Sequence, residues 1–327
     1  MRTIFPAIRV LPLLCLLLLA ETQIACRMRN PLRNPLKPLT ENMLRSGDLS
    51  REGNAAMAQG NWEEAESKLR EAVQINQKEG ELRIHYAEAL WMRGKRGESI
   101  AQLLEAAKTP KGFDSVRLME LDASLAEKLI VLGQYETSIS WANRCIREAP
   151  KDFRGWQLRG RALSHIGEQR AAQGKIEESD GIYLESRNDY FKALSLAPPE
   201  NRDLLPELAQ LQMKMRQPEH ALASWQNLRR LYTRGTEPVN VLVGEAETLL
   251  MLGRCAEAAD RLAIASVHDP ANLTLCLRRA EIEIETGRFE QADQTLQHAY
   301  RLAPNNPGWG DLHNRLRLAL NHRLPSR

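Results

Sequence analysis

Glycine recurs along this chain at one fixed spacing, and that spacing limits the fold more than any other feature does. Gly94 follows Gly60 by 34 residues, and Gly287 follows Gly253 by the same distance. Between these glycines the apolar residues have the period of an α-helix. A repeat period of about 20–50 residues predicts a stack of similar units, each burying its apolar face against its neighbours.

The clearest unit comprises residues 273–306, which carry small, aromatic and turn residues at fixed places. These residues are Ala280, Gly287, Phe289, Ala292, Leu296, Ala299 and Pro304. Ala280 and Ala292 allow two helices to approach closely, Gly287 ends the first helix with a positive φ, and Pro304 stops the second. With its 34-residue period, this pattern resembles the tetratricopeptide repeat (TPR) family.

The resemblance covers residues 46–306 and implies an all-α fold. We expect a TPR solenoid, a right-handed superhelix of about seven helical hairpins, with a C-terminal capping helix and tail over 307–327. The five further units that align with 273–306 are 46–79, 80–113, 119–152, 202–235 and 239–272. The unit 202–235 fits less well, because Pro218 replaces the aromatic residue and no proline closes it.

A longer unit lies in the middle of the array. Trp156, Gly160, Gly174 and Pro198 still occupy repeat-like positions, but the intervals on both sides of Gly174 are longer than in the other units. Both helices are longer by about two turns, and because the two additions are equal, the helices can still pair along their whole length as an antiparallel hairpin. The sequence therefore predicts an extended hairpin over 153–197, with an exposed tip between Glu168 and Glu178.

The N-terminal segment, residues 1–25, reads as a signal peptide or membrane-targeting segment. Arg2 and Arg9 precede an apolar run from Val10 to Ala20, which is too short for an ordinary membrane span. The segment ends in Gln-Ile-Ala before Cys26, which resembles a bacterial lipobox and makes Cys26 the candidate for lipidation. A plain secretory signal and an uncleaved inner-membrane anchor are the alternatives.

Residues 26–45 follow as a basic, proline-rich tether. Proline stands at nearly every third or fourth position from Pro31 to Pro38, which favours an extended, semi-rigid chain. The expected location is the bacterial cell envelope, with the protein exported and either lipid-anchored or periplasmic. An inner-membrane anchor is the alternative.

No motif for catalysis or for a cofactor was found. The seven histidines and five cysteines are scattered, and no zinc-binding pair, phosphate loop or nucleophile motif is present. The net charge of +3 argues against a strongly basic nucleic-acid binder. We therefore expect no enzyme activity, no metal, no cofactor and no nucleic-acid partner.

The resemblance places a partner groove along the first helix of each hairpin. Helical spacing puts eleven candidate residues there: Asn54, Glu88, Trp91, Met92, Arg154, Gln157, Arg161, His165, Glu247, Glu281 and Glu285. Arg154 and Arg161 form a basic spot, while Glu247 and Glu281 begin an acidic end. The alternative interpretation is that these are ordinary solvated helix faces.

These features favour a non-catalytic protein–protein interaction scaffold of the bacterial cell envelope, which binds partner proteins or peptides through the groove. Two alternatives stay open at this stage. The first is a structural, self-assembling envelope protein, and the second is a non-catalytic subunit that positions an enzyme partner. Repeat architecture alone does not decide between them, since a fold does not define a function.

Overall fold

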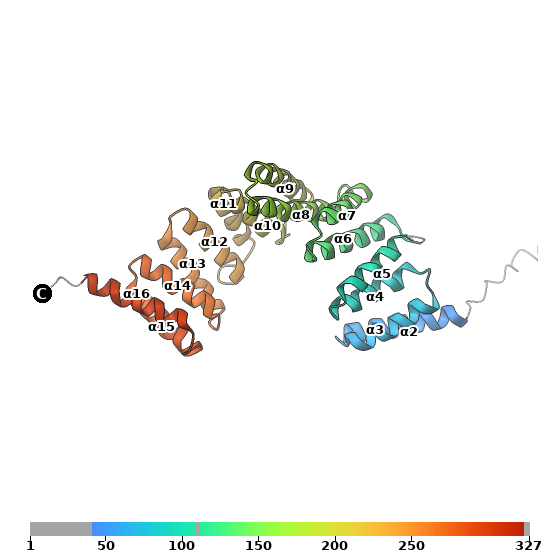
Figure 1. The fold of residues 1–327 in the computed structure, drawn as a ribbon, viewed down its shortest axis with the longest axis horizontal. Helices are drawn as coiled ribbons and strands as arrows, with labels where there is room; N and C mark the ends of the chain where they lie inside the picture. Colours follow the sequence, from blue (N-terminus) through green and yellow to red (C-terminus); the bar gives the residue numbers. More distant parts are fainter. Residues whose placement is uncertain (1–40, 109–111, 324–327) are drawn as a thin grey trace, which may run out of the picture. The chain divides into compact units, whose positions relative to one another are not determined.

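The computed structural model describes residues 41–108 and 112–323. The chain divides into two compact units, one up to Thr109 and one from Pro110 onward. In the first unit the helices are α2 (Glu41–Ala58), α3 (Trp62–Ile75), α4 (Gly80–Met92) and α5 (Arg96–Lys108). In the second unit they are α6 (Ser115–Val131), α7 (Tyr135–Glu148), α8 (Phe153–Ala172), α9 (Ile176–Leu196), α10 (Leu204–Lys214), α11 (Pro218–Arg229), α12 (Val239–Met251), α13 (Cys255–His268), α14 (Leu273–Glu285), α15 (Phe289–Leu302) and α16 (Pro307–Arg323), as Figure 1 shows.

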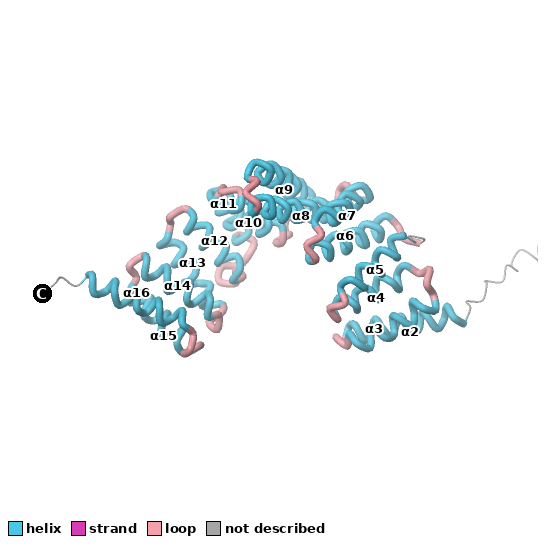
Figure 2. The backbone as a smooth tube through the Cα atoms, in the orientation of Figure 1, coloured by secondary structure: helices cyan, strands magenta, loops and turns pink. Residues whose placement is uncertain are grey.

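The prediction of an all-α repeat fold is confirmed. Across the described ranges the elements are helices joined by short loops, without a strand (Figure 2). Successive helices there pair into seven hairpins, from α2/α3 to α14/α15, and α16 follows the last hairpin. One boundary differs from the expected one: α2 begins at Glu41, inside the segment 26–45 assigned to the tether. The last proline of the predicted tether is Pro38, and residues 41–45 include none that prevents a helix.

Every hairpin turns through a residue with positive φ. These residues are Gly60 (74°), Gly94 (76°), Gly133 (72°), Gly174 (77°), Arg216 (56°), Gly253 (70°) and Gly287 (72°). In the sixth hairpin the N–H of Gly253 donates to the carbonyl of Leu250, and the N–H of Arg254 donates to the carbonyl of Leu249. This pattern satisfies carbonyls at the end of the first helix and starts the second.

A pair of small residues brings the two helices of each hairpin together next to the turn. The pairs are Gly53/Ala65, Ala87/Ser99, Ala126/Ser138, Gly167/Ser179, Ala209/Ala221, Ala246/Ala258 and Ala280/Ala292, and all of these residues are buried. Where the second residue is serine, its hydroxyl donates across the pair, as from Ser138 Oγ to the carbonyl of Ala126 at 2.8 Å. Gly167, which we did not assign from the sequence, takes this position in the fourth hairpin.

The fourth hairpin is longer than the others. α8 and α9 have 20 and 21 residues, against 13 and 14 in α14 and α15. The added turns lie away from the tip, because Gly167 and Ser179 keep the usual distance from Gly174. Below them, Ser186 Oγ donates to the carbonyl of Gly160 at 2.6 Å and makes a second close contact between the helices.

The fourth hairpin contacts a neighbouring helix on each side near its tip. On one side Tyr135, the first residue of α7, stacks on His165 with 4.9 Å between ring centroids. On the other side Lys214, the last residue of α10, binds Glu168. Residues 172–178 lie beyond both contacts and are exposed, which is the segment where the sequence predicted the tip.

Candidate functional site

The candidate site in the second unit is a cavity of about 360 Å³ between α12 and α14. Both are first helices of their hairpins, so the cavity lies on the face where the sequence predicted the groove. Val239, Val243 and Leu250 of α12, with Leu275 of α14, give it an apolar lining. Such an opening can accept an apolar side chain from another molecule.

The sequence of α12 explains why this surface is apolar. The helix buries one stripe, including Leu242 and Leu249, against its neighbours. Val239, Val243 and Leu250 lie on another face of the same helix and are only half-buried. A helix that is apolar on two faces must cover both or leave one open to a partner. These three residues are not among those predicted from the sequence, although the apolar content of 239–252 was a visible signal.

Two charged side chains stand at the rim of this cavity. Glu247 is exposed and, within the described residues, has no cation within 4 Å. Arg278 is turned toward Glu281, with Nη1 at 2.6 Å from Oε2. Glu247, one of the predicted groove residues, therefore leaves an unneutralised negative charge beside the apolar opening.

The other two residues of the predicted acidic end are paired with cations. Arg315 of α16 lies 3.3 Å from Glu281 and 3.4 Å from Glu285. Although burial raises the pKa of Glu281, the hydrogen bonds from Arg278 and Arg315 outweigh it and lower the pKa. The capping helix thus offsets negative charge that the sequence pattern placed in the groove.

The predicted basic spot is neutralised in the same way. Arg154 binds Asp152, with Nη2 at 2.9 Å from Oδ2, and this hydrogen bond raises the pKa of Arg154. Arg161 is half-buried, and although burial lowers its pKa, the hydrogen bond to the carboxylate of Glu207 on α10 outweighs this effect and raises it. Each of the two arginines is therefore held in an ion pair within the fold. Sequence spacing could not reveal Glu207, which lies in the next hairpin.

The other two candidates on α8 also belong to this packed region. Gln157 is buried and donates to Glu207 at 2.9 Å. His165 stacks on Tyr135, and burial together with the charge of Lys214 lowers its pKa. Gln157 and Arg161 therefore both bind the carboxylate of Glu207, whereas His165 contacts Tyr135.

The remaining four candidates lie in the first unit. Asn54 of α2 and Glu88 of α4 are half-buried. Trp91 is half-buried, with the Arg96 guanidinium 5.6 Å from its ring centroid, while Met92 is 49% exposed. Met92 is thus the side chain of this group that is most open to a partner. The lipidation candidate Cys26 lies outside the described residues.

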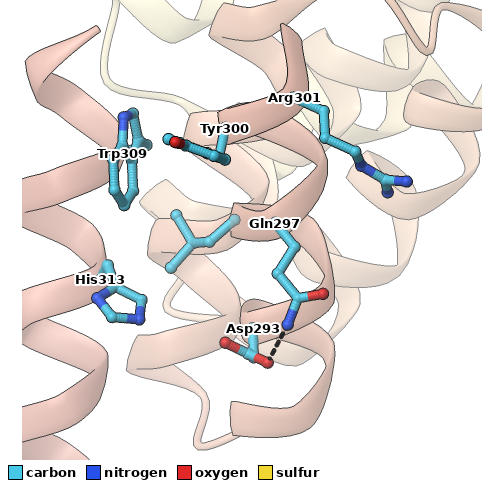
Figure 3. Close-up of a pocket in the computed structure, with 7 residues that line it drawn as sticks. Asp293, Gln297, Tyr300, Arg301, Trp309 and His313 are labelled. Carbon is cyan, nitrogen blue, oxygen red and sulfur yellow. Dashed lines mark hydrogen bonds between the residues drawn. The ribbon is translucent and has the colours of Figure 1, made fainter. Parts of the chain in front are cut away.

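A second cavity, of about 520 Å³, lies between α15 and α16 (Figure 3). The Tyr300 ring meets the Trp309 ring edge-on, with centroids 4.7 Å apart, and the Trp309 indole N–H donates to the carbonyl of Pro304 at 2.9 Å. Gln297 is held by Asp293 on the same helix. These contacts fix α16 on the last hairpin, so we assign the cavity to helix packing.

Two further observations concern metals and membranes. Within the described residues, no group of three or more His, Cys, Asp or Glu side chains could hold a metal ion. No helix in that part of the chain combines the length and the apolar character that a bilayer span requires.

Comparisons with known proteins agree with the repeat geometry. Models of the tetratricopeptide repeat match residues 56–112 and 243–307. The crystal structure of a tetratricopeptide repeat protein from Parabacteroides merdae is similar in fold, with a TM-score of 0.58 and 16% identity, covering 85% of this chain and all of that one. PilW, described as a widely conserved type IV pilus biogenesis factor, has a TM-score of 0.57 and 13% identity, covering 69% of this chain and 94% of that one.

No curated protein sequence gives a significant match to this chain. One family match lies almost entirely in the first unit and the other lies in the second, and helical hairpins also occupy the residues between them. The chain therefore has a tetratricopeptide repeat fold, with matches to the repeat in residues 56–112 and 243–307.

Proposed function

We propose that this protein is a non-catalytic interaction scaffold of the bacterial cell envelope, which holds a partner protein through the cavity between α12 and α14. The TPR fold itself suggests a protein–protein interaction scaffold with protein or peptide partners. The observation that carries the finer proposal is the half-buried apolar surface of Val239, Val243 and Leu250 beside the exposed Glu247.

The chemistry of the cavity specifies the partner segment. Its lining accepts one apolar side chain, whose burial contributes about 1.5–3 kcal/mol. Glu247 favours a lysine or arginine next to that side chain, because opposite charges across an interface select the partner and speed its association. The partner is therefore a protein segment in which an apolar residue lies beside a basic one.

The location in the envelope rests on the N-terminal sequence. The apolar run ending near Ala20, followed by Cys26, supports export with lipidation of the cysteine. Two or more acyl chains on Cys26 would hold the protein stably at a membrane. Intact-mass analysis of the mature protein tests this part separately: an unmodified Cys26 would contradict the lipid anchor without affecting the groove.

A displayed random-peptide library, selected on the purified protein, tests the groove. We expect the enriched peptides to share an apolar residue beside a lysine or arginine. Glu247→Lys should weaken their binding about tenfold or more. Val243→Thr keeps the shape of the side chain but adds a hydroxyl to the cavity, and it should weaken binding several-fold.

Glu185→Lys is the matched control, since Glu185 is an exposed residue of α9, the second helix of its hairpin. It makes the same charge change and should leave binding unaltered. Peptides that bind the Glu247→Lys and Val243→Thr proteins as tightly as the original would refute the proposed groove. A mass that rises with concentration in light scattering would favour the self-assembling alternative instead.

A further inference from the structure

An arginine-rich cavity of about 670 Å³ lies apart from the groove, between α11, α13 and the loop that joins α11 to α12. Arg229 of α11, Arg261 of α13, and Arg230 and Arg234 of the loop line it. It shares no lining residue with the cavity between α12 and α14. The proposed interaction groove leaves this cluster without a function.

The loop over 230–238 is longer than the corresponding connectors at 269–272 and 303–306. It has a defined conformation: Gly235 has φ +87°, and its N–H donates to Glu237 Oε2 at 2.6 Å. His268 Nδ1 lies 2.8 Å from the carbonyl oxygen of Glu237 and ties the loop to α13. The sequence signal was the missing proline at the end of the fifth unit.

The cavity has more positive than negative charge. Arg229 and Arg261 share one buried carboxylate, that of Glu245, with Nε atoms 3.1 and 3.2 Å from its oxygens. This trio therefore keeps one positive charge. Neither Arg230 nor Arg234 has a carboxylate within 4 Å in the described part of the chain; Arg230 Nη1 donates only to Asn227 Oδ1.

The one acidic side chain in the lining is already used by the loop. Hydrogen bonds from the backbone amides of Glu237 and Gly235 outweigh the effect of burial and lower the pKa of Glu237. Four arginines thus face two carboxylates, both of which have partners. The surplus of two positive charges matches the charge of a phosphate monoester at neutral pH.

The cavity also has an aromatic and apolar wall. The Arg202 guanidinium lies 4.4 Å from the Tyr232 ring centroid and donates to the carbonyl of Leu231 at 3.0 Å, which fixes the ring. Ile264 of α13 is 38% exposed beside it. The volume exceeds that of a phosphate group, so the wall leaves room for the organic part of a larger ligand.

We propose that this arginine cavity is a binding site for a phosphate monoester, with the dianion on Arg230 and Arg234 and the organic part against Tyr232. Guanidinium groups bind phosphate oxygens in pairs, which gives both strength and orientation. A free phosphorylated metabolite and a phospholipid headgroup carry this same chemistry. The site is independent of the proposed groove, because the two share no residue.

Isothermal titration of the full chain with phenyl phosphate tests the proposal, with benzoate as the monoanionic comparison. We expect phenyl phosphate to bind and benzoate to bind at least tenfold more weakly. Arg230→Gln combined with Arg234→Gln should weaken phenyl phosphate binding at least tenfold. Arg301→Gln combined with Arg317→Gln removes two exposed arginines elsewhere and should leave binding unaltered.

Sedimentation with phosphatidylcholine vesicles that contain phosphatidic acid separates the two sources of the ligand. If the protein binds the vesicles and the Arg230/Arg234 double variant does not, the ligand is a lipid headgroup. If the protein binds phenyl phosphate but not the vesicles, the ligand is soluble. The double variant controls for any vesicle binding by the N-terminal segment. The proposal is overturned if phenyl phosphate does not bind, if benzoate binds equally well, or if the double variant binds as the original does.

Discussion

Arg216 stands in the fifth hairpin where Gly253 stands in the sixth, and both residues have positive φ, at 56° and 70°. The hydrogen bonds match as well. The N–H of Arg216 donates to Met213 and that of Gln217 to Gln212, in the same pattern that surrounds Gly253. A residue with a Cβ is strained in this conformation by about 1–2 kcal/mol. The fold therefore imposes the turn on a residue that does not favour it.

Arg216→Gly should consequently stabilise the protein. Relief of the strain exceeds the extra entropy of glycine in the unfolded chain, so we expect a gain of about 0.5–1 kcal/mol. Urea unfolding checks this through a higher midpoint with an unchanged slope. Arg301→Gly, at an exposed helical position, should lower stability by a similar amount. Equal effects of the two variants would mean that Arg216 is not strained.

The 34-residue period predicted most of the turns and the small pair Ala280/Ala292 of the clearest unit, because these features depend on residues within one hairpin. The period did not predict the turn at Arg216 or the close contact at Gly167, for two different reasons. Arg216 lacks the residue type that marks a turn, and Gly167 lies in a hairpin whose added turns obscured the register. The spacing to Gly174 could have identified Gly167, since it equals the spacing from Ala280 to Gly287.

The candidate site could be predicted only in part. The helix face was derived from periodicity, and Glu247 indeed lies at the rim of the cavity on that face. The ion-pair partners of Arg161 and Glu281, which are Glu207 and Arg315, were not predicted, because they lie in later helices. Such pairs depend on how neighbouring helices pack, and a single helical wheel does not contain that information.

Asp122 of α6 should make stability fall as pH rises. Its carboxylate is fully buried; Arg144 Nε is 3.2 Å from Oδ2, yet neither oxygen accepts a well-aligned hydrogen bond from the described residues. Burial raises the pKa from 3.8 to about 6, against the attraction of Arg144 and Arg147, and Glu148 adds to the rise. The folded state thus binds the proton more tightly than the unfolded state does.

The native state therefore loses stability between about pH 4 and pH 6, and the loss persists above that range. Relative to Asp122→Asn, the free energy of unfolding of the original protein should fall by about 3 kcal/mol across this window. Urea unfolding of both proteins at several pH values measures it. If the free energy of unfolding of the original protein instead rose with pH relative to that of Asp122→Asn, the ion pair with Arg144 would outweigh the effect of burial.

Two glycines of the fourth hairpin should respond to alanine in opposite directions. A Cβ on Gly167 would lie 2.5 Å from Cε1 of Tyr183, a buried ring, whereas a Cβ on Gly181 would meet no atom within 4 Å. Gly167→Ala should therefore destabilise the protein by about 1–2 kcal/mol. Gly181→Ala, in an exposed helix interior, should stabilise it by about 0.5–1 kcal/mol. Thermal unfolding compares the two variants directly. A Gly167→Ala protein that is stabilised, as Gly181→Ala should be, would contradict the close packing of α8 on α9.

Glu207 should be the side chain that fixes the fourth hairpin against the fifth. Its carboxylate accepts from Gln157 and from Tyr190 Oη, both at 2.9 Å, and from Arg161 Nε at 3.2 Å. Removing it leaves the buried Tyr190 hydroxyl without its acceptor and leaves Arg161 with only the more distant carboxylate of Glu127, at 3.9 Å. Glu207→Ala should accordingly cost about 2–4 kcal/mol of unfolding free energy.

A double-mutant cycle with Tyr190→Phe isolates one of these bonds. Tyr190→Phe removes the donor and keeps the ring, so it should cost less than Glu207→Ala, and the pair should couple by about 1 kcal/mol. Glu185→Ala, at an exposed carboxylate of α9, should change stability by less than about 0.5 kcal/mol. Additive effects of the Glu207 and Tyr190 variants would show that the hydroxyl does not depend on this carboxylate, and that α9 and α10 are held together by apolar packing alone.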